Sequence, residues 1–333
     1  MFFSCYDIKC SLRWLKTRST YPTAWRNLSP FNISVSVFTL MKSIRFGCCH
    51  WIAAELVTTL EDEKPVSALT TMDDELYVAH AASPDIDVFD VESFCLRRRL
   101  IITSIQRTLL AFVSFGQASY CTVTDMTSCR RYHCLYVADG SGGMVRRLDR
   151  RNGKQVTQWS VEGSSPVGLS VTSMFNVVVS CCDSLLLRMY SPHGCPLCEV
   201  SIQQPGIVGL VHAVEQDCGS FLVIGVTQSG NKLASVCQNN AELTADPIDS
   251  SGCPTYLALV GGADSSYVWL AEQGASAGVR MVQVPASQCS AKLPAVDLED
   301  PQKMCWNESG QRLYVVDHGR VKIFHVHMKY IMP

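Results

Sequence analysis

Three features of the 333-residue sequence predict an all-β fold, a six-bladed β-propeller of four-stranded antiparallel blades. An apolar triplet returns six times, with steps of 59, 42, 44, 46 and 46 residues. A period of about 40 to 50 residues built from short strands is typical of propeller blades. A proline-containing segment precedes most of the triplets. The triplets begin at Leu76, Leu135, Val177, Phe221, Tyr267 and Leu313.

The composition fits one large domain that is rich in strands. Apolar residues make up 47% of the chain and charged residues 17%, which favours many buried strands over a disordered or coiled-coil protein. The formal net charge is −2, so nucleic-acid binding requires a local basic patch. No apolar stretch has the length of a membrane-spanning helix. We therefore expect a monomer that does not associate with membranes.

The first 54 residues differ from the rest, because seven Lys or Arg stand against one acid. An acid-poor leader that contains Arg and Ser can be a mitochondrial transit peptide, although Pro22 and Pro30 interrupt any long amphipathic helix. The alternative is a true start at Met41, after a disordered or mispredicted segment. We predict such a basic extension over residues 1–48 and a single propeller domain over 49–333. The expected location is cytoplasmic, or mitochondrial if the leader is a transit peptide.

The cysteines favour a reducing compartment. Seventeen are scattered along the chain, and several lie in apolar segments, where a free thiol acts as a small hydrophobic side chain. The one CxxC motif, Cys195 to Cys198, lacks a second pair at the spacing of a zinc site and falls where a hairpin is due. We expect no metal site and no cofactor.

The second blade shows the repeat most clearly. Residues 134–139, 144–149 and 155–161 have the composition of strands, and Asn152-Gly153 between the last two supplies the positive φ of a tight hairpin. This order predicts an antiparallel meander. The innermost strand of each blade is expected before the triplet, where a proline at the strand entrance removes no ladder hydrogen bond.

These residues resemble the NHL family of six-bladed propellers. Its repeats carry a Pro-x-Gly/Ala opening and a Leu-Tyr-Val-Ala-Asp stretch, followed by a strand that ends in Asp. Residues 135–139 with 144–149 match this pattern well, and residues 313–317 match it in part. His80 stands where Asp is usual, and the fourth and fifth blades lose the Asp. The resemblance covers about residues 60–330 and implies a fold, not one protein.

Ring closure is predicted from the two ends of this region. The chain ends soon after the third strand of the sixth blade, and an open sheet edge is an aggregation hazard. Residues 51–60 have strand composition and precede the first blade. We predict that they pair with residues 321–326. The long step between the first two triplets predicts an insertion around residues 103–120, in which residues 109–115 extend a strand.

A ring of polar residues follows the triplet strands, whose turns gather on one face of a propeller. Its carboxylates and histidines can hold a cation or a basic protein segment. The alternative is that the acids cap turns by accepting hydrogen bonds from backbone amides. The binding-face candidates are His80, Asp139, Asp183, Thr227, Glu272, Asp317 and His318.

Basic residues cluster in the first two blades and suggest RNA as a second partner, because some NHL propellers bind RNA on a positively charged face. The alternative is that arginines on outer strands protect sheet edges. The candidate RNA-binding residues are Arg97, Arg98, Arg99, Arg130, Arg131, Arg146, Arg147, Arg150 and Arg151.

No catalytic residue is assigned. The sequence has no G-x-S-x-G, HExxH, GxxxxGK or GxGxxG motif. Six-bladed calcium-dependent lactonases use a Glu, two Asn and an Asp on one metal, and no Asn follows a triplet here as that site requires. The favoured function is therefore a non-enzymatic scaffold that binds a protein or peptide, expected to be basic. RNA binding and lactonase-like hydrolysis are the alternatives.

Overall fold

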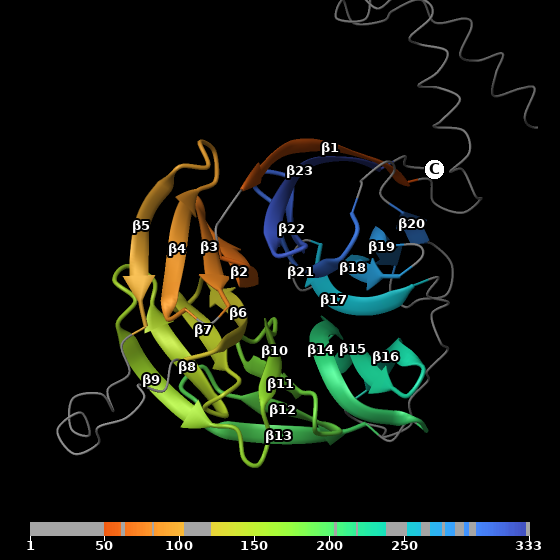
Figure 1. The fold of residues 1–333 in the computed structure, drawn as a ribbon. Helices are drawn as coiled ribbons and strands as arrows, with labels where there is room; N and C mark the ends of the chain where they lie inside the picture. The colour runs from red at the N-terminus through yellow and green to blue at the C-terminus, as the bar shows by residue number, and fades with distance from the viewer. Residues whose placement is uncertain are drawn as a thin grey trace, which may run out of the picture. The chain divides into compact units, whose positions relative to one another are not determined.

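Six antiparallel sheets follow one another along the chain and surround a common centre (Figure 1). The computed structural model describes residues 50–60, 64–81, 83–102, 121–202, 205–217, 219–237, 252–260, 267–274, 277–283, 290–292 and 298–330. The predicted extension over residues 1–48 and the predicted insertion over residues 103–120 lie outside these ranges and stay predictions. No helix in the described ranges is long and apolar enough to cross a membrane.

The first three blades each contain four strands in chain order. The first blade comprises β2 (Val66–Met72), β3 (Glu75–His80), β4 (Asp85–Asp90) and β5 (Leu96–Ile101). The second comprises β6 (Val123–Cys129), β7 (Cys134–Asp139), β8 (Met144–Asp149) and β9 (Gln155–Ser160). The third comprises β10 (Pro166–Val171), β11 (Val177–Cys181), β12 (Leu186–Tyr190) and β13 (Pro196–Ser201).

The remaining blades keep this order, with one change at the end of the chain. The fourth blade has three described strands, β14 (Ile207–Asp217), β15 (Ser220–Thr227) and β16 (Gly230–Cys237). The fifth comprises β17 (Cys253–Leu259), β18 (Tyr267–Gln273), β19 (Gly278–Gln283) and β20 (Ser290–Lys292). The sixth comprises β21 (Pro301–Asn307), β22 (Arg312–Asp317), β23 (Arg320–Tyr330) and, from the start of the described chain, β1 (His50–Leu60).

The ring closes where β1 pairs with β23. The two strands run antiparallel in a register that extends from His50 opposite Tyr330 to Leu60 opposite Val321. Figure 1 shows β1, in red-brown, along the outer edge of the blue sixth blade. The predicted six-bladed propeller and its closure by an N-terminal strand are both confirmed.

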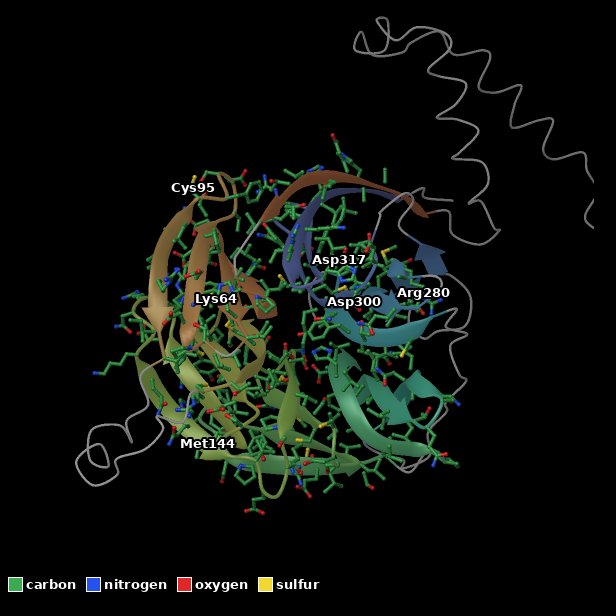
Figure 2. The ribbon with its side chains drawn as sticks, viewed as in Figure 1. Lys64, Cys95, Met144, Arg280, Asp300 and Asp317 are labelled. Carbon is green, nitrogen blue, oxygen red and sulfur yellow. The ribbon has the colours of Figure 1, made fainter. Side chains whose placement is uncertain are left out.

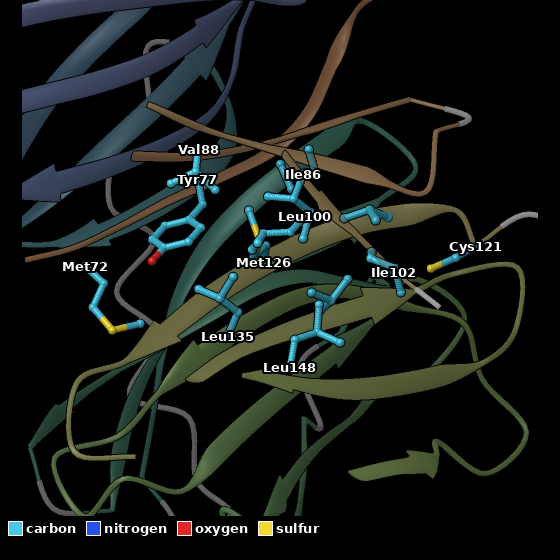
Figure 3. Packing of buried hydrophobic residues seen from close by; sticks show 14 residues of the cluster. Met72, Tyr77, Ile86, Val88, Leu100, Ile102, Cys121, Met126, Leu135 and Leu148 are labelled. Atoms are coloured by element: carbon cyan, nitrogen blue, oxygen red, sulfur yellow. The ribbon is translucent and has the colours of Figure 1, made fainter. Parts of the chain in front are cut away.

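The hydrophobic core lies between neighbouring blades, and the triplets explain why. Successive side chains of a strand point to opposite faces of its sheet. On β7, Leu135 and Val137 pack in the core shared with the first blade, whereas Tyr136 and Ala138 pack in the core shared with the third. Figure 3 shows the first of these cores, where Tyr77 and Leu100 approach Leu135 and Leu148. Every position of the triplet is apolar because both faces of the second strand are buried.

Each innermost strand carries a register shift near its first residue, opposite the end of the second strand. A bulge of this kind leaves one residue unpaired and turns its side chain aside. In the second blade this residue is Thr124, which donates a hydrogen bond to the Pro166 carbonyl oxygen of the next blade at 2.7 Å. Thr255 contacts Pro301 in the same way at 2.7 Å. The bulges thus link neighbouring blades.

Candidate functional site

The predicted ring of polar residues lies at the ends of the second strands, where three of its four acids form ion pairs within their own blades. Asp139 is 2% exposed, and it accepts hydrogen bonds from Arg146 Nη2 at 2.6 Å and from the Gly142 amide at 3.1 Å. Burial alone would raise the pKa of Asp139, but Arg146 and the turn donors outweigh it and hold the pKa below its ordinary value. Asp317 is equally buried and pairs with Lys322 Nζ at 2.7 Å.

The same position recurs around the propeller. Glu272 lies 3.0 Å from Arg280, and His80 lies 3.2 Å from Asp87. In the third blade, the residue at the end of the second strand, opposite the start of the innermost strand, is Cys181. In the fourth blade it is Thr227, whose hydroxyl donates to the Gly230 carbonyl oxygen. These pairs join the second strand of a blade to its third.

Asp183 and His318 lie just beyond the ends of their strands and are exposed. Asp183 accepts a hydrogen bond from the Ser165 amide at 3.3 Å, and His318 Nε2 lies 2.9 Å from a Glu299 carboxylate oxygen. Asp300 donates its amide to Asp317 at 2.6 Å, and Figure 2 labels both residues on the sixth blade. The seven candidates are therefore held by partners in their own blades, and a role in binding stays a prediction. Among the described residues, no group of three or more His, Cys, Asp or Glu side chains is placed to hold a metal ion.

Most of the candidate RNA-binding arginines also have partners. Arg97 pairs with Asp74 at 2.7 Å, Arg98 with Glu75 at 2.9 Å and Arg99 with Asp87 at 2.6 Å. Arg146 pairs with Asp139, and Arg150 with Asp73. Arg147 lies 3.0 Å from His193 Nδ1. Arg130, Arg131 and Arg151 are exposed, and no ion pair joins them to an acid in the part of the chain that the structure describes.

A polar network that sequence reasoning missed joins five of the six innermost strands. Asp125 on β6 is fully buried and accepts hydrogen bonds from the Tyr256 hydroxyl at 3.0 Å and the Leu169 amide at 2.7 Å. Lys303 Nζ lies 3.3 Å from Asp125, and the His212 ring stacks on Tyr256 with centroids 3.9 Å apart. We call these four side chains, Asp125, His212, Tyr256 and Lys303, the hub. A charged residue inside an innermost strand was the sequence signal for it.

The hub holds His212 neutral. Its Nε2 donates to the Leu169 carbonyl oxygen at 3.1 Å. The pKa of His212 is lowered to about 4, because burial and the positive charge of Lys303 together outweigh the opposing effects of Asp125 and of the hydrogen bond to Leu169. The charges of Asp125 and Lys303 offset each other. In addition, the hydrogen bonds of the hub connect neighbouring blades, so the hub stabilises the centre of the propeller.

An exposed cluster of side chains lies at the ends of the second and third blades away from the predicted polar ring, in their turns from first to second strand and, for His193, in the turn between β12 and β13. We call Tyr132, Met174, Phe175 and His193 the aromatic patch. Met174 is 69% exposed, Phe175 41% and Tyr132 36%. The Tyr132 ring lies edge-on to Phe175 at 6.4 Å and to His193 at 5.8 Å. The Arg147 guanidinium lies 5.4 Å from the Tyr132 ring centre, so the patch has a cationic floor.

The backbone holds Phe175 in a strained conformation. The described turns from first to second strand each contain one residue with positive φ, namely Asp73, His133, Phe175, Gly219 and Gln311. Four of these are polar residues or glycine, which tolerate this region well, whereas Phe175 is a bulky aromatic with a φ of 65°. Strain of this kind is concentrated at binding sites. Turn chemistry predicts polar residues here, so the Met-Phe pair in a turn was the available sequence signal.

Solved structures share the fold at low identity. The hydrazine synthase of Kuenenia stuttgartiensis aligns with a TM-score of 0.56 and 12% identity, covering 78% of this chain and 76% of that chain. Streptogramin B lyase aligns at 0.54 and 10%, covering 84% and 98%. The Cps50 (Swd1) β-propeller domain of Myceliophteria thermophila aligns at 0.56 and 10%, covering 82% and 100%. No family model and no curated protein matches the sequence. These likenesses show the propeller fold alone.

Proposed function

We propose that this propeller is a scaffold that binds a protein or peptide segment, and that the aromatic patch is its binding surface. The exposed Phe175, held at positive φ against Tyr132, is the observation that carries the proposal. Aromatic residues, Met and Arg are the types enriched in the buried centres of protein interfaces. A fixed ring loses little conformational entropy when a partner covers it. The patch therefore has the features of an anchor site.

The charges around the patch favour an acidic segment. Arg130 and Arg131 precede Tyr132 in the same turn, and both are exposed. The acids Asp139, Glu272 and Asp317, which the sequence suggested as a site for a basic partner, are buried against cations of their own blades. A segment with an apolar anchor flanked by Asp or Glu complements the patch in both shape and charge.

Selection of random phage-displayed peptides against the full chain tests this function. We expect enriched sequences that combine an aromatic residue or Leu with several acids. Fluorescence anisotropy with labelled copies should then show binding at least about tenfold weaker for Met174→Ser and for Phe175→Ala. Val156→Ser on β9 is the control, because Val156 is also exposed but lies outside the patch. Equal affinity in the patch variants and the wild type contradicts the proposal.

The same assay separates the other partners. Selected peptides rich in Lys, whose binding is lost in Asp139→Asn, would instead favour the acids at the ends of the second strands as the binding site. Displacement of the selected peptide by single-stranded RNA, lost in the Arg130→Glu/Arg131→Glu variant, would favour RNA as the natural ligand. Neither result is expected, because a single turn offers few phosphate contacts and most of the other arginines are paired.

A further inference from the structure

Two cysteines flank the turn that carries Tyr132. Cys129 is the last residue of β6, Cys134 is the first residue of β7, and they are direct cross-strand partners. Direct partners in antiparallel strands have Cα atoms about 4.5 to 5.5 Å apart, which lies within the range that a disulfide spans. Both are free thiols, at 2% and 1% exposure. The geometry for a disulfide is therefore present in the reduced protein.

The turn directs hydrogen-bond donors at Cys129. The Cys134 thiol and the backbone N–H groups of Tyr132 and Arg131 donate to its sulfur, and Arg147 adds positive charge. These donors lower the pKa of Cys129, whereas the hydrogen bond to Cys129 and, after it, burial raise the pKa of Cys134. Cys129 is therefore the more readily deprotonated thiol of the pair. Lowered pKa and nearby cations are typical of reactive cysteines.

The sixth blade shows what this position does when no cysteine is present. Its turn has the same length, because Asn307 pairs with Arg312 as Cys129 pairs with Cys134. There the Asn307 side-chain oxygen accepts hydrogen bonds from the Gly310 amide at 3.2 Å and the Ser309 hydroxyl at 2.7 Å. The last residue of the innermost strand therefore accepts hydrogen bonds from the following turn in both blades. In the second blade they act on a sulfur atom that can change oxidation state.

We propose that Cys129 and Cys134 are a thiol modification site, which a hydroperoxide converts into a reversible disulfide across the base of the turn. The Cys129 thiolate attacks one peroxide oxygen, the O–O bond breaks, and Cys129 becomes a sulfenic acid. The Cys134 sulfur then attacks the Cys129 sulfur, the S–O bond breaks and water leaves. Two thiols are oxidised while the peroxide is reduced to water or alcohol, and a dithiol reductant reverses the change.

Access and consequence both follow from the turn. Residues 130–133 are exposed, whereas both cysteines pack in the core between the second and third blades, so the peroxide reaches the sulfur atoms when this end of the hairpin opens. The disulfide fixes the ends of the turn that presents Arg130, Arg131 and Tyr132. Regulation of peptide binding by this change rests on the function proposed above, whereas formation of the disulfide does not.

Peptide mapping after treatment of the full chain with hydrogen peroxide tests the site. Trypsin cleaves after Arg130 and Arg131, so a disulfide joins the peptide of residues 108–130 to that of residues 132–146. We expect this linked product to form first, and to disappear in Cys129→Ser and after reduction. Cys121→Ser is the control, because Cys121 lies in the same peptide but burial raises its pKa to about 12. The proposed site is contradicted if the linked product disappears in Cys121→Ser. It is also contradicted if no linked product forms while other thiols of the chain are oxidised.

Two further measurements complete the test. Cys129 in the reduced protein should react with iodoacetamide at least about tenfold faster than Cys305, whose burial raises its pKa. Equal rates contradict an activated Cys129. The selected peptide should bind the oxidised and reduced proteins with affinities that differ several-fold, and Cys129→Ser should remove the difference. Unchanged affinity with a proven disulfide overturns the regulatory role and leaves the modification site in place.

Discussion

Phe175 has a backbone conformation that costs folding free energy, and the proposed binding role would account for it. The positive φ of a residue with a side chain costs about 1 to 2 kcal/mol, and Asn tolerates it better than Phe. We expect Phe175→Asn to leave the free energy of unfolding unchanged or to raise it by about 1 kcal/mol, while peptide binding falls. Urea unfolding measures the first quantity and anisotropy the second. A loss of about 3 kcal/mol, as for a core Phe, would contradict the strained-anchor role.

Gly168 makes room for the hub. A Cβ atom at this position would lie 2.3 Å from the Val211 carbonyl oxygen and 3.0 Å from His212 Cα. Because both contacts are backbone atoms, the third and fourth blades must separate to admit a methyl group. We expect Gly168→Ala to lower the free energy of unfolding by about 2 kcal/mol or more. Gly310→Ala is the control, since its nearest atom would lie 3.7 Å away. Equal stability of the two variants would refute the close packing.

These two residues mark the limit of sequence reasoning about sites. The predicted carboxylates do end the second strands, but burial against third-strand cations depends on register, as the pairing of Arg146 with Asp139 shows. The sequence also does not show which residues of different blades come into contact, so the close packing of His212 against Gly168 could not be predicted. The Met174-Phe175 pair was visible as an apolar break in a turn. Its contact with Tyr132 of another blade was not.

At the scale of strands, the prediction succeeded because the signals are local and repeated. The triplets alternate between two cores, and this alternation demands an apolar residue at every position. The closing strand could be predicted because an unpaired edge is costly and only one segment was free to cover it. The bulge at the start of each innermost strand was not predicted, since an extra residue in a ladder leaves no distinct composition.

The β1 strand should decide whether the sixth blade is stable. A chain that begins at Lys64 lacks β1 and exposes the long edge of β23, whereas a chain that begins at His50 keeps both strands. We expect the shorter chain to melt at a lower temperature and to associate through the open edge. Thermal unfolding and size-exclusion chromatography of the two chains measure these effects. A monomeric shorter chain with the same melting temperature would show that the edge needs no cover.

At the scale of the whole molecule, the hub couples stability to pH. Burial keeps the pKa of His212 at about 4 in the folded chain, against an ordinary value of 6.5 in the unfolded chain. The unfolded chain therefore binds the proton more tightly. Stability is full above about pH 6.5 and falls by about 3 kcal/mol as the pH drops to about 4. Asp125, Lys303 and Tyr256 face the ring; burial and the charge of Lys303 keep it neutral, and the charge of Asp125 only partly opposes them.

Urea unfolding over this pH range, with wild type and His212→Gln, measures the effect. Gln retains a donor for the Leu169 carbonyl oxygen but cannot take up a proton in this range. The variant should lose much less stability than the wild type between about pH 6.5 and 5, where most carboxylates stay ionised. Parallel pH profiles for the two proteins would assign the acid sensitivity to groups outside the hub.

Closure by β1 also sets an order of events during synthesis. β1 is the first of the described strands to be made, and its partner β23 is the last. The outermost strand of the sixth blade must therefore wait, unpaired, while every other blade is translated. Blades one to five can form as their hairpins emerge, but the ring closes only when residues about 260 to 280 positions apart in the sequence meet. During that interval β1 can pair with the strand of another chain, so slow completion of translation favours association through this strand.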